Sequence, residues 1–239
     1  MKVSWFSAGV SSAVATKLAL SDDRDIKIIY IDIDDQHPDS MRFVKDCEAW
    51  FEKPIEILKS SYGNVDAVCR TFKYVNGVGG ARCTVTLKKR VRKEWEMQNN
   101  PKTYVWGMDS SPRERNRAER IVETMPQYNH VFPLIEKYLT KEDAHAILRE
   151  AGIKRPKMYD LGYPNNNCIG CVKGGKGYWN QIRKDFPDVF ASRAAMERVV
   201  GHSCIKGVFL DELPPDEGRK QKIICEDCGI MCEIYAERD

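Results

Sequence analysis

The chain contains 239 residues, which is enough for one large hydrophobic core or for a core with an appendage. Hydrophobic residues make up 42% of it and charged residues 31%, as expected for an ordered globular protein. A formal net charge of +3 neither demands nor excludes a nucleic-acid partner, and no apolar run approaches the roughly 20 residues that span a membrane. We therefore expect a cytoplasmic protein.

The first segment reads as a strand, a loop and a helix. Residues 3–6 form a short apolar run, residues 7–12 have the sequence SAGVSS, and an alanine-rich stretch follows. Small residues let backbone N–H groups approach an anion, while the hydroxyls of Ser7, Ser11 and Ser12 and the positive end of the next helix attract it further. The segment predicts a phosphate or sulfate site. A turn without a ligand and a signal peptide are the alternatives.

Strands and helices alternate through the next part of the chain. Residues 27–33, KIIYIDI, are β-branched or apolar at nearly every position, which is typical of a central parallel strand covered on both faces. Further strands are expected at residues 55–58, 103–107 and 130–133, and helices at residues 39–51, 65–71, 86–98, 116–123, 141–151, 178–186 and 190–200. Thr140 and Asp143 form a capping-box pattern before one of these helices. The alternation predicts an α/β fold with a parallel sheet, whose ligands bind beyond the carboxyl ends of the strands.

Composition divides the chain into three parts. Residues 1–155 form the predicted α/β domain. Residues 156–211 contain a turn-rich loop with two cysteines and two helices, which we expect to pack on that domain. Residues 212–239 begin as a linker rich in proline and acidic residues and end as a cysteine-rich tail.

Nine cysteines are many for a cytoplasmic chain, where disulfides are rare. Two residues separate Cys168 from Cys171, a spacing that lets both sulfurs meet one metal or cluster. Cys83, which precedes a basic run, would supply a third thiolate, with an ordinary buried cysteine as the alternative. We therefore expect an iron–sulfur cluster, of the [4Fe–4S] type, on these three cysteines, with zinc as the alternative. Cys47 and Cys69 lie on amphipathic segments and are predicted to belong to the core.

Three further cysteines, Cys225, Cys228 and Cys232, lie in the tail. They would complete a zinc site with Cys168 and Cys171, supply a fourth cluster ligand, or carry a nucleophilic thiol. A reactive thiol needs thiolate character and access, and a tail behind a linker has the access. The pattern by itself leaves these three roles open.

Polar and basic residues follow two of the predicted strands. Asp32, Asp34 and His37 close the strand at residues 27–33, and Asp109 follows the strand at residues 103–107. An arginine-rich segment comes next, with Arg113, Arg115, Arg117 and Arg120. In a parallel sheet these ends share one edge with the SAGVSS loop, so guanidinium groups there would bind a second anionic group of a nucleotide. Arg117 is the preferred ligand.

These motifs resemble the phosphoadenosine phosphosulfate (PAPS) reductase family, within the adenine-nucleotide alpha-hydrolase superfamily. The SAGVSS run is similar to its modified PP-loop, and residues 32–51, with HPDSMRF, to the segment after its second strand. RCT at residues 82–84 with LK at 87–88 matches its first cysteine region, and YDLGY at 159–163 with the C-x-x-C pair matches its second. DCGI at residues 227–230 resembles its C-terminal nucleophile motif. The likeness covers almost the whole chain and is greatest to versions carried by bacteriophages and prophages.

The resemblance implies a five-stranded parallel sheet with helices on both faces, and an adenine nucleotide (PAPS, adenosine phosphosulfate (APS) or ATP) on the PP-loop. By this resemblance the phosphates would bind to Ser7, Gly9, Ser11 and Ser12. The adenosine would lie beside Ile31 and Asp32, and the terminal anion would contact Lys88 and Arg117. Cys228 would attack the sulfonyl sulfur, and a thiol reductant such as thioredoxin would then release sulfite. A homo-oligomer is expected, in the cytoplasm of a bacterial host if a phage encodes it.

Four positions depart from the family pattern. Arg82 stands where cluster-containing members have the first of two tandem cysteines, Met231 stands in place of the motif histidine, and Cys232 is additional. Ser11 stands where ATP-pyrophosphatase members carry an aspartate that helps to hold magnesium. Because serine does not replace this magnesium ligand, the position favours reduction over adenylation.

Two other functions stay open. A related PP-loop sulfurtransferase would thiolate nucleic acid, using a three-thiolate cluster and the basic face of residues 86–93. A non-catalytic nucleotide-binding protein would instead use the tail cysteines to hold structural zinc.

Overall fold

One parallel sheet organises the part of the chain that the computed structural model describes, residues 1–77 and 80–219. Its strands follow the order β3-β2-β1-β4-β5, with β1 at the centre. The strands are β1 (Lys2–Phe6), β2 (Ile26–Asp32), β3 (Ile55–Lys59), β4 (Thr103–Val105) and β5 (Asn129–Val131). Every neighbouring pair is parallel, so the predicted α/β fold with five parallel strands is confirmed.

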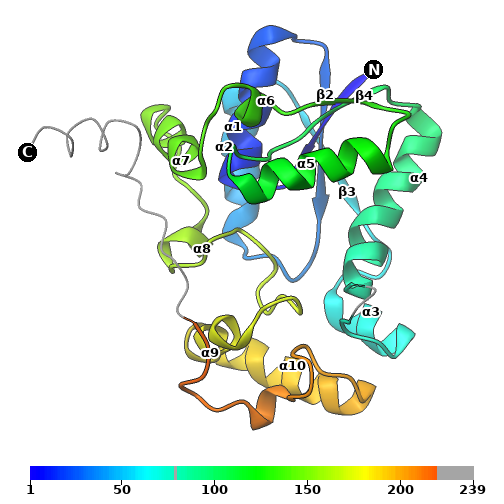
Figure 1. Ribbon diagram of the computed structural model, residues 1–239, viewed down its shortest axis with the longest axis vertical. Coiled ribbons are helices and arrows are strands. Elements are labelled where there is room, and N and C mark those ends of the chain that lie inside the picture. The colour runs from blue at the N-terminus through cyan, green and yellow to red at the C-terminus, as the bar shows by residue number, and fades with distance from the viewer. Residues whose placement is uncertain (78–79, 220–239) are drawn as a thin grey trace, which may run out of the picture.

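Helices alternate with the strands and are shown in Figure 1. They are α1 (Val10–Asp22), α2 (Asp39–Phe51), α3 (Val65–Phe72), a π-helix (Thr84–Lys89), α4 (Arg90–Asn99), α5 (Pro112–Thr124), α6 (Pro133–Glu136), α7 (Lys141–Glu150), α8 (Lys157–Asp160), α9 (Lys176–Asp185), α10 (Pro187–Val200) and a 3-10 turn (Leu210–Glu212). None of those in the described residues has the length and apolar character to span a bilayer.

The alternation of side chains along β1 distributes the helices over both faces of the sheet. Ser4 faces α1, where its hydroxyl lies 2.7 Å from the Thr16 hydroxyl, and Phe6 belongs to the same buried cluster as residues of α1, α2 and α7. Val3 points the other way and packs with Trp95 of α4. Successive strand residues point to opposite faces, which is why both faces are covered.

Several helix starts differ from the predictions, and α5, α9 and α10 begin two to four residues earlier than expected, at Pro112, Lys176 and Pro187. The helix expected at residues 86–98 begins earlier, as a π-helical turn at Thr84–Lys89 that runs directly into α4. Pro133, expected to end a strand, instead opens α6. Proline fits the first position of a helix because the N–H that it lacks would have no hydrogen-bond partner within the helix there. The capping box of α7 is confirmed: the Asp143 N–H donates to the Thr140 Oγ1, and the Thr140 N–H to the Asp143 carboxylate.

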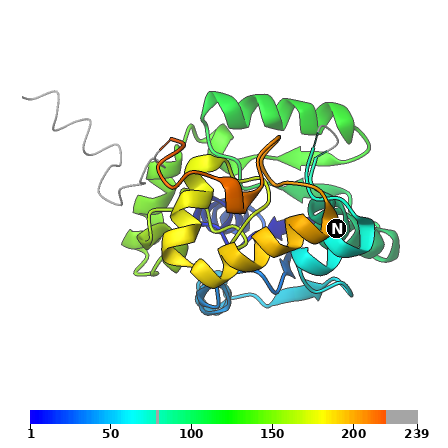
Figure 2. The same cartoon turned by 90° about the horizontal axis from the view of Figure 1, so that it is seen from below.

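A second buried cluster lies beyond the carboxyl ends of the strands. It joins α3 and the π-helix to α9 and α10, with Trp179 at 0% exposure as its largest member. Figures 1 and 2 show α9 and α10 together at this end of the molecule, across the edge toward which β2 points. The sheet edge that carries the predicted ligand residues is thus covered by residues that follow Pro156.

Candidate active site

The SAGVSS loop, residues 7–12, joins β1 to α1 at the carboxyl edge of the sheet. Ala8 has a left-handed backbone with φ of 55°, and the Ser7 N–H donates to the Ser12 Oγ at 2.8 Å. The loop therefore folds over the first turn of α1, with Ser7 exposed, Gly9 and Ser11 half-buried and Ser12 buried. Because the positive end of α1 meets this loop, the loop has the geometry and the charge to bind an anion.

Two side chains from the second cysteine region hold the loop from its buried side. The Val10 N–H donates to the Tyr159 hydroxyl at 3.3 Å, and the Asn166 Nδ2 donates to the Ala8 carbonyl at 2.7 Å. Asn166 also donates to the Ser40 hydroxyl at 3.1 Å, which connects α2 to the same network. The loop is therefore supported by residues far away in the sequence before any ligand binds.

Gly107, after β4, lets that strand approach the loop closely. A Cβ atom at this position would lie 2.4 Å from the Ser12 Cα, a distance at which backbone must move. Only glycine keeps the end of β4 and the start of α1 this close, so the glycine that ends the predicted strand fixes the width of the site.

A buried histidine packs behind Tyr159. The His145 ring meets the Tyr159 ring edge to face, with 4.7 Å between the ring centroids and 1% of the residue exposed. Burial lowers the pKa of His145 to about 3, so the imidazole is neutral at ordinary pH. Among the described residues neither ring nitrogen has a hydrogen-bond partner, and the ring acts here as packing for Tyr159.

The end of β2 lies beside the loop, as the sequence predicts. The register pairs Phe6 with Tyr30, so Ile31 and Asp32 follow at the same edge as Ser7. The Asp32 carboxylate lies 3.8 Å from the Lys59 ammonium group. Burial, and then the Asp32 charge, raises the pKa of Tyr30 above its ordinary value. This arrangement places a carboxylate and an apolar side chain at the same sheet edge as the SAGVSS loop.

The two predicted cations lie in different surroundings. Arg117 of α5 is 59% exposed and pairs with Glu114 at 3.1 Å, and within the described residues no hydrogen bond or ion pair joins it to the loop. Lys88 lies on the π-helix, where its charge acts on Cys168. The structure thus places Lys88 near the predicted thiolates.

The predicted cluster cysteines are neighbours in space. Burial raises the pKa of Cys168 to about 12, and the nearby Cys171 and Cys83 add to the effect. Burial likewise raises the pKa of Cys83, to which Cys171 contributes, while the Lys173 charge lowers it. Cys47 and Cys69 are fully buried, as predicted. Three sulfur atoms from two distant segments therefore share one neighbourhood with several cations.

The donor set suits a soft metal or an iron–sulfur cluster by its chemistry, because thiolates are the ligands that such groups prefer. In residues 1–77 and 80–219, however, no three His, Cys, Asp or Glu side chains converge closely enough to hold a metal ion. The three sulfurs would have to move together on binding. The tail cysteines, including Cys228, lie outside the described residues.

A buried ion pair anchors the loop that carries the C-x-x-C motif. Arg193 of α10, 3% exposed, forms an ion pair with Asp35 and donates through its Nε to the Gly170 carbonyl at 3.3 Å. The other Asp35 carboxylate oxygen accepts from the Val65 N–H at 2.6 Å, and the Asp35 carbonyl accepts from the Ile169 N–H at 2.8 Å. Asp35 and Arg193 thus join the end of β2, the start of α3, the cysteine loop and α10.

No sequence pattern assigned a role to Tyr159, Asn166 or Arg193. The first two lie in stretches that the sequence marks, the YDLGY run and the asparagine-rich turn before Cys168, but their partners lie about 150 positions away in the chain. Arg193 lies on a helix without any motif. Only the tertiary fold reveals these contacts.

Comparisons with known proteins agree with this architecture. A family model described as "Phosphoadenosine phosphosulfate reductase domain" matches residues 2–174. The crystal structure of a PAPS reductase from Candida auris in complex with phosphate superimposes with a TM-score of 0.51 at 14% identity, covering 70% of this chain and 81% of that one. At this identity the superposition shows the fold alone. No curated protein sequence matches the chain significantly. Since the family model spans most of the sequence, the chain belongs to the phosphoadenosine phosphosulfate reductase domain family.

Proposed function

We propose that the protein is a sulfonucleotide reductase-like enzyme that acts on PAPS or APS. The observation that carries the proposal is the SAGVSS loop, which lies at the carboxyl edge of the sheet, is held from behind by Tyr159 and Asn166, and presents a helix N-terminus. The family match over residues 2–174 supports the same reaction class.

The loop would hold the phosphates of the nucleotide. Ser7 is exposed and Gly9 and Ser11 are half-buried, so their polar groups would be available to a phosphate, while Ser12 shapes the loop through its contact with the Ser7 N–H. No carboxylate stands at position 11, so an anionic phosphosulfate meets no repelling charge within the loop. Ile31 and Asp32 would contact the adenosine, since they leave β2 next to the loop.

Lys88 and Arg117 would contact the terminal anion of the substrate. Lys88 lies on the cysteine side of the site, near Cys168. Arg117 would have to leave its exposed pair with Glu114, and such pairs are weak enough to exchange for a bound anion.

Cys228 of the tail would be the nucleophile. Its thiolate would attack the sulfonyl sulfur, and the S–O bond to the nucleotide would break with the phosphate oxygen as the leaving group, so that the enzyme carries an S-sulfonate. A dithiol protein such as thioredoxin would then attack the Cys228 sulfur. Sulfite would leave with the electron pair of the S–S bond, and the second thiol of the reductant would close its disulfide and restore the Cys228 thiol.

Cys83, Cys168 and Cys171 would hold an iron–sulfur cluster, with zinc as the alternative. A cluster bound by three protein thiolates would supply one iron open to a further ligand. Iron, zinc and acid-labile sulfide per chain, measured on protein purified without oxygen, distinguish the two. Roughly four irons with matching sulfide would support the cluster, whereas zinc alone would refute it.

The test of the proposed function is sulfite formation from APS and from PAPS, with reduced thioredoxin as the electron donor. Cys228→Ser is expected to abolish sulfite formation, while Cys225→Ser and Cys232→Ser serve as matched changes in the same tail. Undiminished sulfite formation by the Cys228→Ser protein would rule out the assigned nucleophile.

A further inference from the structure

A cavity of about 370 Å³ opens between the end of α3 and the start of the π-helix. It shares no residue with the SAGVSS loop; its lining consists of Phe72, Tyr74, Gly80, Ala81, Arg82 and Val85. Its volume falls within the range of pockets that bind small ligands. Nothing in the proposed reductase reaction uses this cavity.

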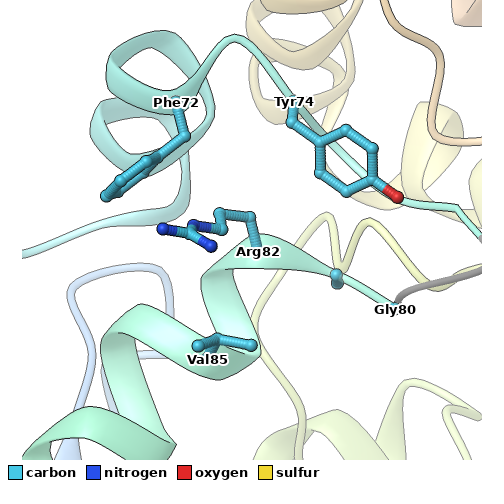
Figure 3. Close-up of a pocket in the computed structure, with 6 residues that line it drawn as sticks. Phe72, Tyr74, Gly80, Arg82 and Val85 are labelled. Carbon is cyan, nitrogen blue, oxygen red and sulfur yellow. The ribbon is translucent and has the colours of Figure 1, made fainter.

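The cation of this cavity is held in place but has no anion. The Arg82 guanidinium lies 4.0 Å from the centre of the Phe72 ring, and Figure 3 shows it next to Phe72, with its side chain pointing away from Tyr74. Its Nε is buried without a hydrogen-bond partner, and no carboxylate pairs with this arginine among residues 1–77 and 80–219. A guanidinium already held against an aromatic ring loses little freedom when it binds a phosphate.

The remaining lining offers aromatic and apolar surface to a planar ligand. Phe72 and Tyr74 are half-buried, and Tyr74 is held by the His202 ring at a centroid distance of 5.1 Å. Val85 is 40% exposed at the edge of the cavity. Rigid aromatic side chains beside a cation are the usual surface on which unstacked nucleobases lie.

A row of lysines continues from the cavity along the helical segment. Val85, Lys89 and Lys93 are each four residues apart, so they lie on successive turns, and both lysines are exposed. The arginines next to them are neutralised, because Arg90 pairs with Glu94 at 2.8 Å and Arg92 with Glu96 at 3.1 Å. Neither lysine has an ion-pair partner in the described part of the chain, so their charge is free for phosphates that follow the first.

We infer that the cavity binds one unstacked nucleotide of a single-stranded nucleic acid, with the base against Tyr74, its phosphate on Arg82, which Phe72 supports from behind, and the next phosphates along Lys89 and Lys93. This site is separate from the adenine-nucleotide loop and adds a macromolecular ligand to the proposed function. The unpartnered guanidinium and the lysine row favour a polyanion over an acidic protein segment, since they repeat a charge at intervals along one direction.

The experiment measures fluorescence anisotropy of labelled single-stranded DNA and RNA of about ten nucleotides, with the matched duplex and a free mononucleotide as competitors. Arg82→Ala and Tyr74→Leu are each expected to weaken binding by roughly 10-fold or more. Tyr74→Phe keeps the ring and should bind as the unchanged protein does. Arg24→Ala is the control for net charge, because it removes one positive charge just before the amino end of β2.

Salt dependence provides a second readout. Three phosphate contacts predict a slope of log affinity against log salt of about −2, and Arg82→Ala should reduce its magnitude by about 0.7. APS binding by the same variants should be unchanged, which separates this site from the loop and from any loss of folding. If APS binding also falls, Lys89→Ala and Lys93→Ala repeat the comparison, because they change exposed side chains of the same proposed site.

Several outcomes would overturn the inference. The first is that no strand binds even at low salt, and the second is that strand binding is not weakened by Arg82→Ala or by Tyr74→Leu. The third is that the duplex binds with equal affinity, and the fourth is that a free mononucleotide binds as tightly as the strand. A loop variant such as Gly9→Val gives a further comparison. If this variant loses both strand binding and reductase activity while Arg82→Ala has no effect, the nucleic acid binds to the loop instead.

Discussion

Replacing Arg193 with methionine should strongly destabilise the protein. The Arg193 and Asp35 side chains are 4% and 13% exposed, so Arg193→Met leaves a carboxylate largely buried without its cation. Breaking a buried pair by removing one partner costs about 3–5 kcal/mol. The Gly170 carbonyl also loses the donor on Arg193. The loss should loosen the cysteine loop, because Asp35 and Arg193 both bond to it.

Urea unfolding followed by circular dichroism measures this effect for Arg193→Met, Asp35→Asn and the double variant. Since the second change removes the charge that the first left unpaired, the double variant should be more stable than the sum of losses predicts, by about 2 kcal/mol. Arg198→Met is the matched control on the same helix, because Arg198 pairs with Asp211 on the exposed surface and should matter far less. Reaction of Cys171 with a thiol reagent should be faster in Arg193→Met than in this control. Additive losses in the double variant would refute the account of the pair.

Three further predictions concern the loop and its support. Gly107→Ala should cost about 1–3 kcal/mol of stability, because the added Cβ atom would clash with Ser12. It should also weaken APS binding, which calorimetry measures. Gly175→Ala is the control that should have neither effect, because a Cβ atom at Gly175 would enter open space. Tyr159→Phe leaves the Val10 N–H without its acceptor and should cost about 1–3 kcal/mol together with nucleotide affinity; unchanged affinity would contradict the supporting role. The pKa of His145 falls from 6.5 to about 3 on folding, so between these values the unfolded chain binds a proton that the folded chain does not. Stability should therefore drop as the pH falls below about 6.5, by at most ~1.4 kcal/mol per pH unit, and His145→Leu should remove this part of a pH series of unfolding curves.

Much of the fold follows from the sequence because local patterns decide it. The apolar run before Asp34 is an interior strand, β2, and the SAGVSS run after β1 is a loop that enters a helix, since residue type alone specifies strand and turn there. The capping box before α7 is equally local. The π-helical start after Cys83 was not predicted, because the basic run has the same composition as an ordinary α-helix.

The candidate site was predictable only where it consists of consecutive residues. The loop and the C-x-x-C pair are local, and the structure brings Cys83 to the pair across about 85 positions of chain, as the family resemblance implies. The supporting contacts of Tyr159, Asn166 and Arg193 depend on how distant segments pack, which no local pattern encodes. The roles of the tail cysteines and the likeness to phage proteins stay predictions.

The most direct test of the central claim is a single turnover of APS or PAPS without any reductant, followed by mass spectrometry of the tail peptide. The account predicts one SO3 group on Cys228 and one released nucleotide per modified chain, and no adduct in Cys228→Ser. Nucleotide that binds to the loop but leaves every cysteine of the unchanged protein unmodified would contradict it.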